Sequence, residues 1–201
     1  MADSNTYRDD PDVQLMLEFQ GGDERAFRTL YDRYKRPVFV WIYRMVRKPE
    51  RAEELTQEVF IRVYRAKERY KAEARFRTWL YTIAARLAFN ERRQQKRSVE
   101  DLALESEAGE SPIDRAEDVK ERSPLEVVEA SRLHEAIARF LSQLPERQRA
   151  ALMLRYFEEL SHDEISDILG VRKGAVKSLL HRGLVNLEAI LRQSGHPESG
   201  A

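Results

Sequence analysis

The chain has 201 residues, with 35 basic and 35 acidic residues that cancel to a formal net charge of zero, and no cysteine. The lack of cysteine excludes a disulfide framework and cysteine-ligated zinc or iron–sulfur sites. The longest apolar run, at 38–43, is far shorter than the ~20 residues of a membrane span, and the start of the chain shows no signal-peptide pattern, so we expect a cytoplasmic protein without membrane insertion.

The net charge of zero conceals three unlike segments. Residues 1–97 carry a net charge of +7, residues 98–130 carry −8, and residues 131–201 carry +1. A charge asymmetry of this kind indicates a polyanionic partner. The middle segment also has several serines, a glycine and prolines, and few large apolar side chains, which predicts a flexible acidic linker over 98–130.

Helical periodicity dominates on both sides of this linker, because glycine and proline are few and no segment alternates apolar and polar residues over the length of a strand. The sequence therefore predicts an all-α fold of two small helical domains, 1–97 and 131–201. The expected helices are 12–20, 23–47, 50–69 and 76–97 in the first domain, and 131–142, 145–158, 161–169 and 172–192 in the second.

Motifs of catalysis and of cofactor binding are missing from the sequence. It contains no Gly-x-x-x-x-Gly-Lys phosphate loop and no Gly-x-Ser-x-Gly motif, and its four histidines form no i,i+4 pair with a glutamate for a metal. We therefore expect no enzyme activity, no cofactor and no metal site.

The predicted helix 50–69 begins with a cluster of polar residues: Glu53, Glu54, Gln57 and Glu58. Compensation of the helix dipole explains acidic residues at this end without any function, whereas a basic protein partner is the sharper interpretation. Five apolar residues of the same helix are expected near the core: Leu55, Val59, Ile61, Val63 and Tyr64.

The predicted helix 76–97 carries two stripes. At 100° per residue, its core stripe is Phe76, Leu80, Ile83, Ala84 and Leu87. An adjacent basic stripe consists of Arg75, Trp79, Thr82, Arg86, Asn90, Arg93 and Arg97. Guanidinium groups pair with phosphates and an aromatic ring offers a stacking face, so this stripe suits a nucleic-acid backbone beside an unstacked base. The alternative is a solvated helix end with a half-buried tryptophan.

Residues 161–180, SHDEISDILGVRKGAVKSLL, predict two short helices that meet at Gly170. Ser161 and Glu164 have the spacing of a capping box, and Gly170 permits a left-handed turn, a pattern typical of a helix-turn-helix. The residues expected to contact DNA or to face outward are Arg172, Lys173, Lys177, Ser178, His181 and Arg182. The alternative is a helical hairpin inside a bundle.

Four segments taken together, at 22–46, 52–66, 76–93 and 144–182, resemble the extracytoplasmic-function sigma factors of bacterial RNA polymerase. This resemblance implies that Glu53, Glu54, Leu55, Gln57 and Glu58 bind core RNA polymerase. It implies that the loop 70–75, with Lys71, and the basic stripe bind the minus-ten element of promoter DNA. It also implies that the six residues of the helix-turn-helix bind the minus-35 element, that the linker runs toward the RNA exit path, and that an anti-sigma factor is a further partner.

The chain departs from the family pattern at two places. The family often has Ile-Ala-Arg-Asn where this chain has Ile-Ala-Ala-Arg at 83–86, which moves the arginine by one position. In the last predicted helix, Ala175, Leu179, Gly183 and Leu184 replace polar or basic types, so we expect this domain to bind DNA weakly by itself. Two alternatives follow, a sigma mimic that sequesters an anti-sigma factor without binding DNA, and a ligand-sensing helix-turn-helix regulator.

Overall fold

The computed structural model describes residues 7–102 and 137–194, with 96–102 described by their backbone alone. These residues form helices and connecting turns without a strand, which confirms the all-α prediction. The first group of helices is α1 (Pro11–Gln20), α2 (Glu24–Val46), α3 (Pro49–Arg65), the 3₁₀ turn η1 (Lys67–Arg69) and α4 (Phe76–Leu102). The second group is a short helix at 137–142 followed by α6 (Glu146–Tyr156), α7 (His162–Leu169) and α8 (Lys173–Gln193).

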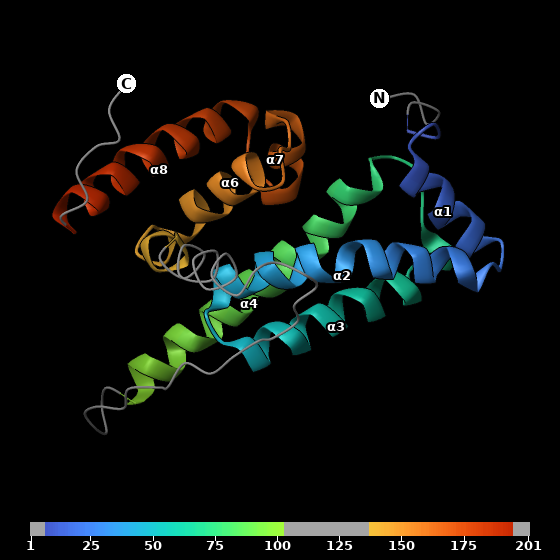
Figure 1. Cartoon of the computed structure of the whole chain (residues 1–201), viewed down its shortest axis with the longest axis horizontal. Coiled ribbons are helices and arrows are strands. Elements are labelled where there is room, and N and C mark those ends of the chain that lie inside the picture. The colour runs from blue at the N-terminus through green and yellow to red at the C-terminus, as the bar shows by residue number, and fades with distance from the viewer. Residues whose placement is uncertain (1–6, 103–136, 195–201) are drawn as a thin grey trace, which may run out of the picture.

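The first group is a bundle in which α2 contacts α1, α3 and α4 (Figure 1). Local sequence sets where its helices begin. The side chain of Asp10 accepts hydrogen bonds from the backbone N–H groups of Asp12 and Val13, and Pro11 occupies the first helical position, where its missing N–H costs nothing. Trp41 and Tyr81 are almost completely buried and meet edge to face in the core of this bundle.

The second group is smaller, and α6 and α7 both pack on α8. The predicted capping box is present at the start of α7, because Ser161 Oγ accepts from the backbone N–H of Glu164 while Glu164 accepts from the backbone N–H of Ser161. The helix ends at Gly170, which adopts a left-handed conformation at φ 60°. Ser166 then donates to the carbonyl oxygen of Val171 at 2.6 Å, which holds the turn before α8.

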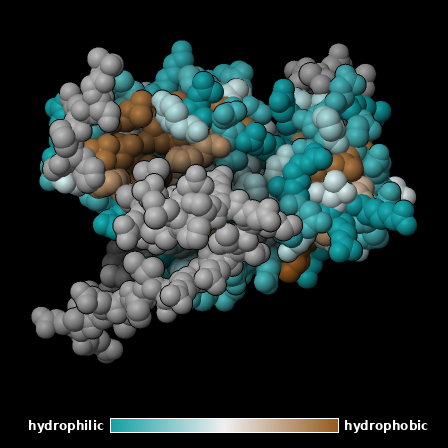
Figure 2. Space-filling model, viewed as in Figure 1, coloured by the Kyte–Doolittle hydropathy of each residue, from teal (hydrophilic) through white to brown (hydrophobic). Residues whose placement is uncertain are grey.

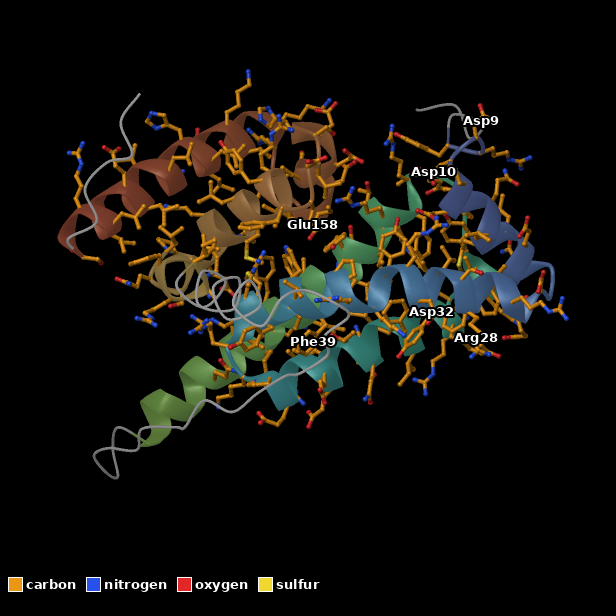
Figure 3. The ribbon with its side chains drawn as sticks, in the orientation of Figure 1. Asp9, Asp10, Arg28, Asp32, Phe39 and Glu158 are labelled. Atoms are coloured by element: carbon orange, nitrogen blue, oxygen red, sulfur yellow. The ribbon has the colours of Figure 1, made fainter. Side chains whose placement is uncertain are left out.

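The two groups pack against each other, since α7 lies on α4 and α6 contacts α2 (Figure 1). Glu158, in the connection between α6 and α7, lies where the second group approaches α4 (Figure 3). We call the contacts between the groups the interdomain interface; its polar members are Arg44, Arg77, Thr78, Arg149, Glu158 and Glu164.

Seven of the eight predicted helices are found in the described residues, with shifted ends, and of the predicted helix 131–142 the part 137–142 is described and helical. Helix α4 continues to Leu102, five residues beyond its predicted end at 97, so the first residues assigned to the linker are helical. The remaining linker and the start of the predicted second domain, 103–136, lie outside the described residues, and the predicted domain limits stay a prediction. Within the described part of the chain, no helix is both long enough and apolar enough to span a bilayer.

Candidate nucleic-acid interface

The basic stripe of α4 is exposed along most of its length. Arg75, Arg86, Asn90 and Arg93 are all exposed, and the nearest side-chain partner of Arg93 is Asn90, at 3.5 Å. Helix α7 packs on the neighbouring face of α4, where Thr78 is buried, and its Glu164 interacts electrostatically with Arg75, whereas the guanidinium groups of Arg86 and Arg93 stay uncovered. The side chain of Arg97 lies outside the described residues. Arg86 and Arg93 are therefore free to meet a polyanion.

An aromatic hollow lies at the N-terminal end of the stripe. Trp79 is half-buried and packs edge to face on Tyr70, with ring centroids 5.0 Å apart, and in a tilted arrangement on Phe76, with centroids 5.9 Å apart. Burial raises the pKa of the Tyr70 hydroxyl, so this group stays neutral and adds no negative charge to the hollow. The hollow has a volume of 330 Å³ and is lined by Ala66, Arg69, Tyr70, Lys71, Glu73, Ala74 and Trp79. It combines a stacking face with cationic side chains.

The helix-turn-helix presents its predicted contact residues to solvent. Arg172, Lys173, Lys177, Ser178, His181 and Arg182 are all exposed on α8 or just before it. Two of these cations are already engaged within the domain. Lys173 pairs with Asp163 at 2.7 Å, which raises the pKa of its ammonium group, and Arg182 donates to the carbonyl of Ser178 at 3.2 Å.

The departures from the family pattern in α8 have different local surroundings. Gly183 is buried, and a Cβ atom at this position would lie 3.0 Å from the side chain of Leu152 on α6, so glycine lets α6 and α8 pack closely. Leu184 has the helical spacing of an apolar face with Val176, Leu180 and Leu187, which predicts burial, but it is 44% exposed, and Val185 beside it is 50% exposed. Figure 2 shows apolar surface over this part of the molecule.

The candidate polymerase-binding face on α3 is only partly as expected. Glu53, Glu54 and Gln57 are exposed, and Glu58 is partly exposed and pairs with Arg62 at 2.7 Å. Arg51 links Glu54 to Glu91 of α4, with 2.8 Å between Arg51 and Glu91. Leu55 is only 5% exposed and belongs to the core, so it supports this face from beneath and offers no surface to a partner.

Sequence reasoning missed two apolar residues of the same face. Ile61 and Tyr64 were assigned to the core, yet each is 42% exposed, and they follow Gln57 at intervals of four and three residues. This spacing places them on the exposed side with Glu53 and Gln57, and it is the signal that could have identified them. The Tyr64 ring also packs against Phe27, with centroids 5.2 Å apart. The face is therefore part acidic and part apolar.

Family models match both parts of the chain. "Sigma-70 region 2" matches residues 30–98, and "Sigma-70, region 4" matches residues 134–187. The ECF RNA polymerase sigma factor SigW of Bacillus subtilis is 33% identical over 174 residues, which are 85% of this chain and 91% of that protein. The ECF sigma-E factor of Escherichia coli K12 is 34% identical over 175 residues, which are 85% and 89% of the two chains.

Solved structures show the same fold. CnrH in complex with the cytosolic domain of CnrY aligns with a TM-score of 0.65 at 20% identity, over 90% of this chain and 97% of the other. The sigma factor RpoE from Bartonella quintana, in complex with the anti-sigma factor NepR, also aligns at 0.65, with 19% identity over 83% and 96%. The solved structures show the fold, and the family models with the sequence relatives place the chain in the family of extracytoplasmic-function sigma factors of RNA polymerase, which are transcription initiation factors without enzymatic activity.

Proposed function

We propose that this sigma factor binds core RNA polymerase in the cytoplasm and directs it to promoters, reading the minus-ten element with α4 and the minus-35 element with α8. The observation that carries the proposal is the exposed arginine stripe of α4, which ends at the hollow beside Trp79. A solvated helix end requires neither an aromatic hollow nor exposed arginines such as Arg86 and Arg93, which have no acidic partner among the described contacts.

At the minus-ten element, strand opening exposes bases and phosphates together. Arg75, Arg86 and Arg93 neutralise phosphates of one strand, while the hollow beside Trp79 receives an unstacked base. Base–aromatic stacking contributes ~1–3 kcal/mol and offsets part of the cost of unpairing. The protein breaks no covalent bond and favours the open strand by binding it.

At the minus-35 element, the N-terminal part of α8 enters the major groove of duplex DNA. Arg172, Lys177 and Ser178 are exposed at this end, where backbone N–H groups also favour phosphate. Because Lys173 and Arg182 already have partners in the protein, few cations are free for this contact. This supports a weak DNA-binding domain that acts while polymerase holds it in place.

The mixed face of α3 is the proposed contact with core polymerase. Exposed Glu53, Glu54 and Gln57 provide charge complementarity to a basic surface, and the exposed parts of Ile61 and Tyr64 add apolar area. An anti-sigma factor is a further proposed partner, because the structurally similar RpoE is seen in complex with the anti-sigma factor NepR, and CnrH in complex with the cytosolic domain of CnrY.

Reconstituted transcription with purified core polymerase tests this function. The wild-type chain is expected to start transcription from a dedicated promoter, identified by sequencing transcripts after overexpression. Replacing Arg86 and Arg93 together by alanine should reduce open complexes about tenfold or more, since two phosphate contacts are lost, while core binding measured by pull-down stays unchanged.

The matched control is the double replacement of Arg25 and Arg28 by alanine, which removes two exposed charges from the N-terminal part of α2, where Figure 3 labels Arg28. It should leave open complexes at the wild-type level. Full activity of the Arg86 and Arg93 variant would remove the stripe from the mechanism. A wild-type chain that binds an anti-sigma factor but starts no transcription with core polymerase would instead establish the mimic.

A further inference from the structure

One wall of the hollow beside Trp79 is held in place from α1, a helix that has no part in the proposed DNA contacts. We infer that Gln20, the last residue of α1, is a positioning residue for capture of the unstacked base, because its side-chain amide fixes the backbone of Tyr70, on which the Trp79 ring packs. This role rests on the proposed function, in which the hollow receives a base of the minus-ten element. Gln20 itself touches no DNA.

The side chain of Gln20 reaches the segment that leads into the hollow. Its Nε2 donates to the carbonyl oxygen of Lys67 at 2.8 Å and to that of Tyr70 at 3.2 Å, which are 47 and 50 positions later in the chain. A side-chain amide carries two N–H groups, so one glutamine can serve both carbonyls. Lys67 is the first residue of η1 and Tyr70 follows the last, so Gln20 binds both ends of this turn.

Tyr70 is anchored to α1 through its backbone. Its side chain is 6% exposed, and its hydroxyl has no hydrogen-bond partner among the described residues. Its backbone N–H donates to the carbonyl of Lys67 at 3.2 Å, which is a bond within the same turn. In the described part of the chain, the bond from Gln20 is therefore the hydrogen bond that ties Tyr70 to another helix.

The start of η1 is fixed by its side chain as well. The ammonium group of Lys67 lies 4.8 Å from the ring centroid of Phe19 and 5.6 Å from that of Tyr64, which are cation–π contacts, and 3.6 Å from the carboxylate of Glu24. Consecutive residues of α1, Phe19 and Gln20, thus hold the side chain and the carbonyl of the same lysine. The turn is docked on α1 before any DNA is bound.

The docked turn sets the orientation of the stacking ring. Tyr70 and Trp79 both line the hollow, and their rings meet edge to face with centroids 5.0 Å apart. A preorganised site costs less ordering when it binds its ligand, so a fixed Tyr70 makes base capture stronger without a contact of its own. Loss of the Gln20 bonds should let Tyr70 move and leave Trp79 without a fixed neighbour. The alternative is that Gln20 only stabilises the packing of η1 on α1.

Forked promoter DNA with and without the captured base separates these two roles. The probe is the holoenzyme with a fork whose minus-ten strand is single-stranded, and each base of that strand is replaced in turn by an abasic sugar. Base selectivity is the Kd for the abasic fork divided by the Kd for the intact fork. At the captured position, the wild-type chain should have a base selectivity of about 5-fold to 150-fold, and Trp79→Ala should reduce it to about one.

Gln20→Met removes both N–H donors and keeps an unbranched side chain that suits a helix. Base selectivity should fall about threefold to tenfold, as expected for two lost hydrogen bonds, while the Kd for the abasic fork stays within about twofold of the wild-type value. Gln20→Glu keeps the shape but cannot donate to the two carbonyls, so its selectivity should fall at least as far. Gln20→Met combined with Trp79→Ala should lose no more than Trp79→Ala alone, because both act on the same hollow.

The matched control is Gln143→Met. Gln143 is an exposed glutamine in the turn before α6, and its side chain has no hydrogen bond in the described part of the chain. This variant loses the same amide group from the second group of helices and should keep the wild-type base selectivity. The Kd for the abasic fork also reports, for every variant, whether the protein is folded and bound to polymerase.

Two results would overturn the role of Gln20 alone. One is a base selectivity that Trp79→Ala abolishes but both Gln20 variants leave intact. The other is an equal loss of affinity for the intact and abasic forks in the Gln20 variants, or losses that add to that of Trp79→Ala, which would show a purely structural role. A wild-type base selectivity near one at every position would instead reject base capture in the proposed function, and the role of Gln20 with it.

Discussion

The two candidate DNA surfaces differ in how their cations are held. Along the α4 stripe, Arg86 and Arg93 are exposed and have no acidic partner among the described contacts, whereas Arg75, just before α4, interacts electrostatically with Glu164 of α7. An aromatic hollow lies at the same end as Arg75. On α8, Lys173 is paired with Asp163 and Arg182 with the backbone carbonyl of Ser178, and the contact residues include no Trp, Tyr or Phe. The first surface suits single-stranded DNA, and the second suits the groove of a duplex.

This difference assigns the two surfaces different shares of the binding free energy. Free guanidinium groups gain the full release of counterions from phosphate, whereas a lysine that must first leave an aspartate gains less. The α4 surface therefore contributes more to affinity and to strand opening. The α8 surface contributes mainly to where the polymerase complex is placed along the promoter. Two predictions test this comparison and one tests the packing that positions α8, and they follow from the largest expected effect to the smallest.

Trp79→Ala should have the largest effect. Loss of the stacking face is expected to cost ~1–3 kcal/mol, which lowers the fraction of open complexes by about 5-fold to 150-fold. Permanganate footprinting of the opened strand measures it. Trp79→Phe keeps a ring and should lose much less, and thermal melting checks that packing on Tyr70 is retained. Equal losses in both variants would show that the ring acts through packing alone.

The second test uses two glycines of α8: Gly183, which is buried against α6, and Gly174, which is exposed. Gly183→Leu forces a side chain against Leu152 and should destabilise the second group of helices by ~1–3 kcal/mol. Gly174→Leu, where a Cβ meets no atom within 4 Å, should be neutral or stabilise by up to ~1 kcal/mol. Urea unfolding measures both. Similar values at the two positions would contradict the close approach of α6 and α8.

The smallest effect is expected from single lysines of α8. Lys177→Ala should reduce the slope of log K against log salt by ~0.9, as one phosphate contact is lost. Lys173→Ala should reduce it by less, because Asp163 already holds its ammonium group. Titration of promoter DNA with the polymerase complex, followed by fluorescence anisotropy, gives both slopes. A larger effect at Lys173 would reverse the proposed order.

The sequence predicts the elements of this fold well because their signals are local. The capping box of Ser161 and Glu164, the left-handed Gly170 and the core stripe of Phe76, Leu80 and Ala84 all appear as expected. Each of these depends on residues within one or two helical turns. The exposed cations of the candidate DNA surfaces were found for the same reason, since a helix face follows from periodicity.

The wrong predictions concern burial, because the sequence does not show which neighbouring element covers a given helix face. Ile61, Tyr64 and Leu184 have apolar side chains but lack a full covering neighbour, whereas Leu55 is covered. The burial of Arg149 is also invisible to periodicity, because its partners at Arg44 and Met45 lie more than a hundred positions earlier in the chain. Such contacts depend on how two groups of helices dock, which local pattern does not encode.

Glu164 serves two structures at once. It closes the capping box at the start of α7 and accepts a hydrogen bond from Thr78 of α4. Burial raises the pKa of its carboxyl, but the hydrogen bonds from Ser161 and Thr78 outweigh this and hold the pKa below its usual value. Because one carboxylate stabilises both the helix end and the docking of the domains, separation of the domains and fraying of the first turn of α7 are thermodynamically coupled. Amide hydrogen exchange in that turn is therefore an internal reporter of domain opening.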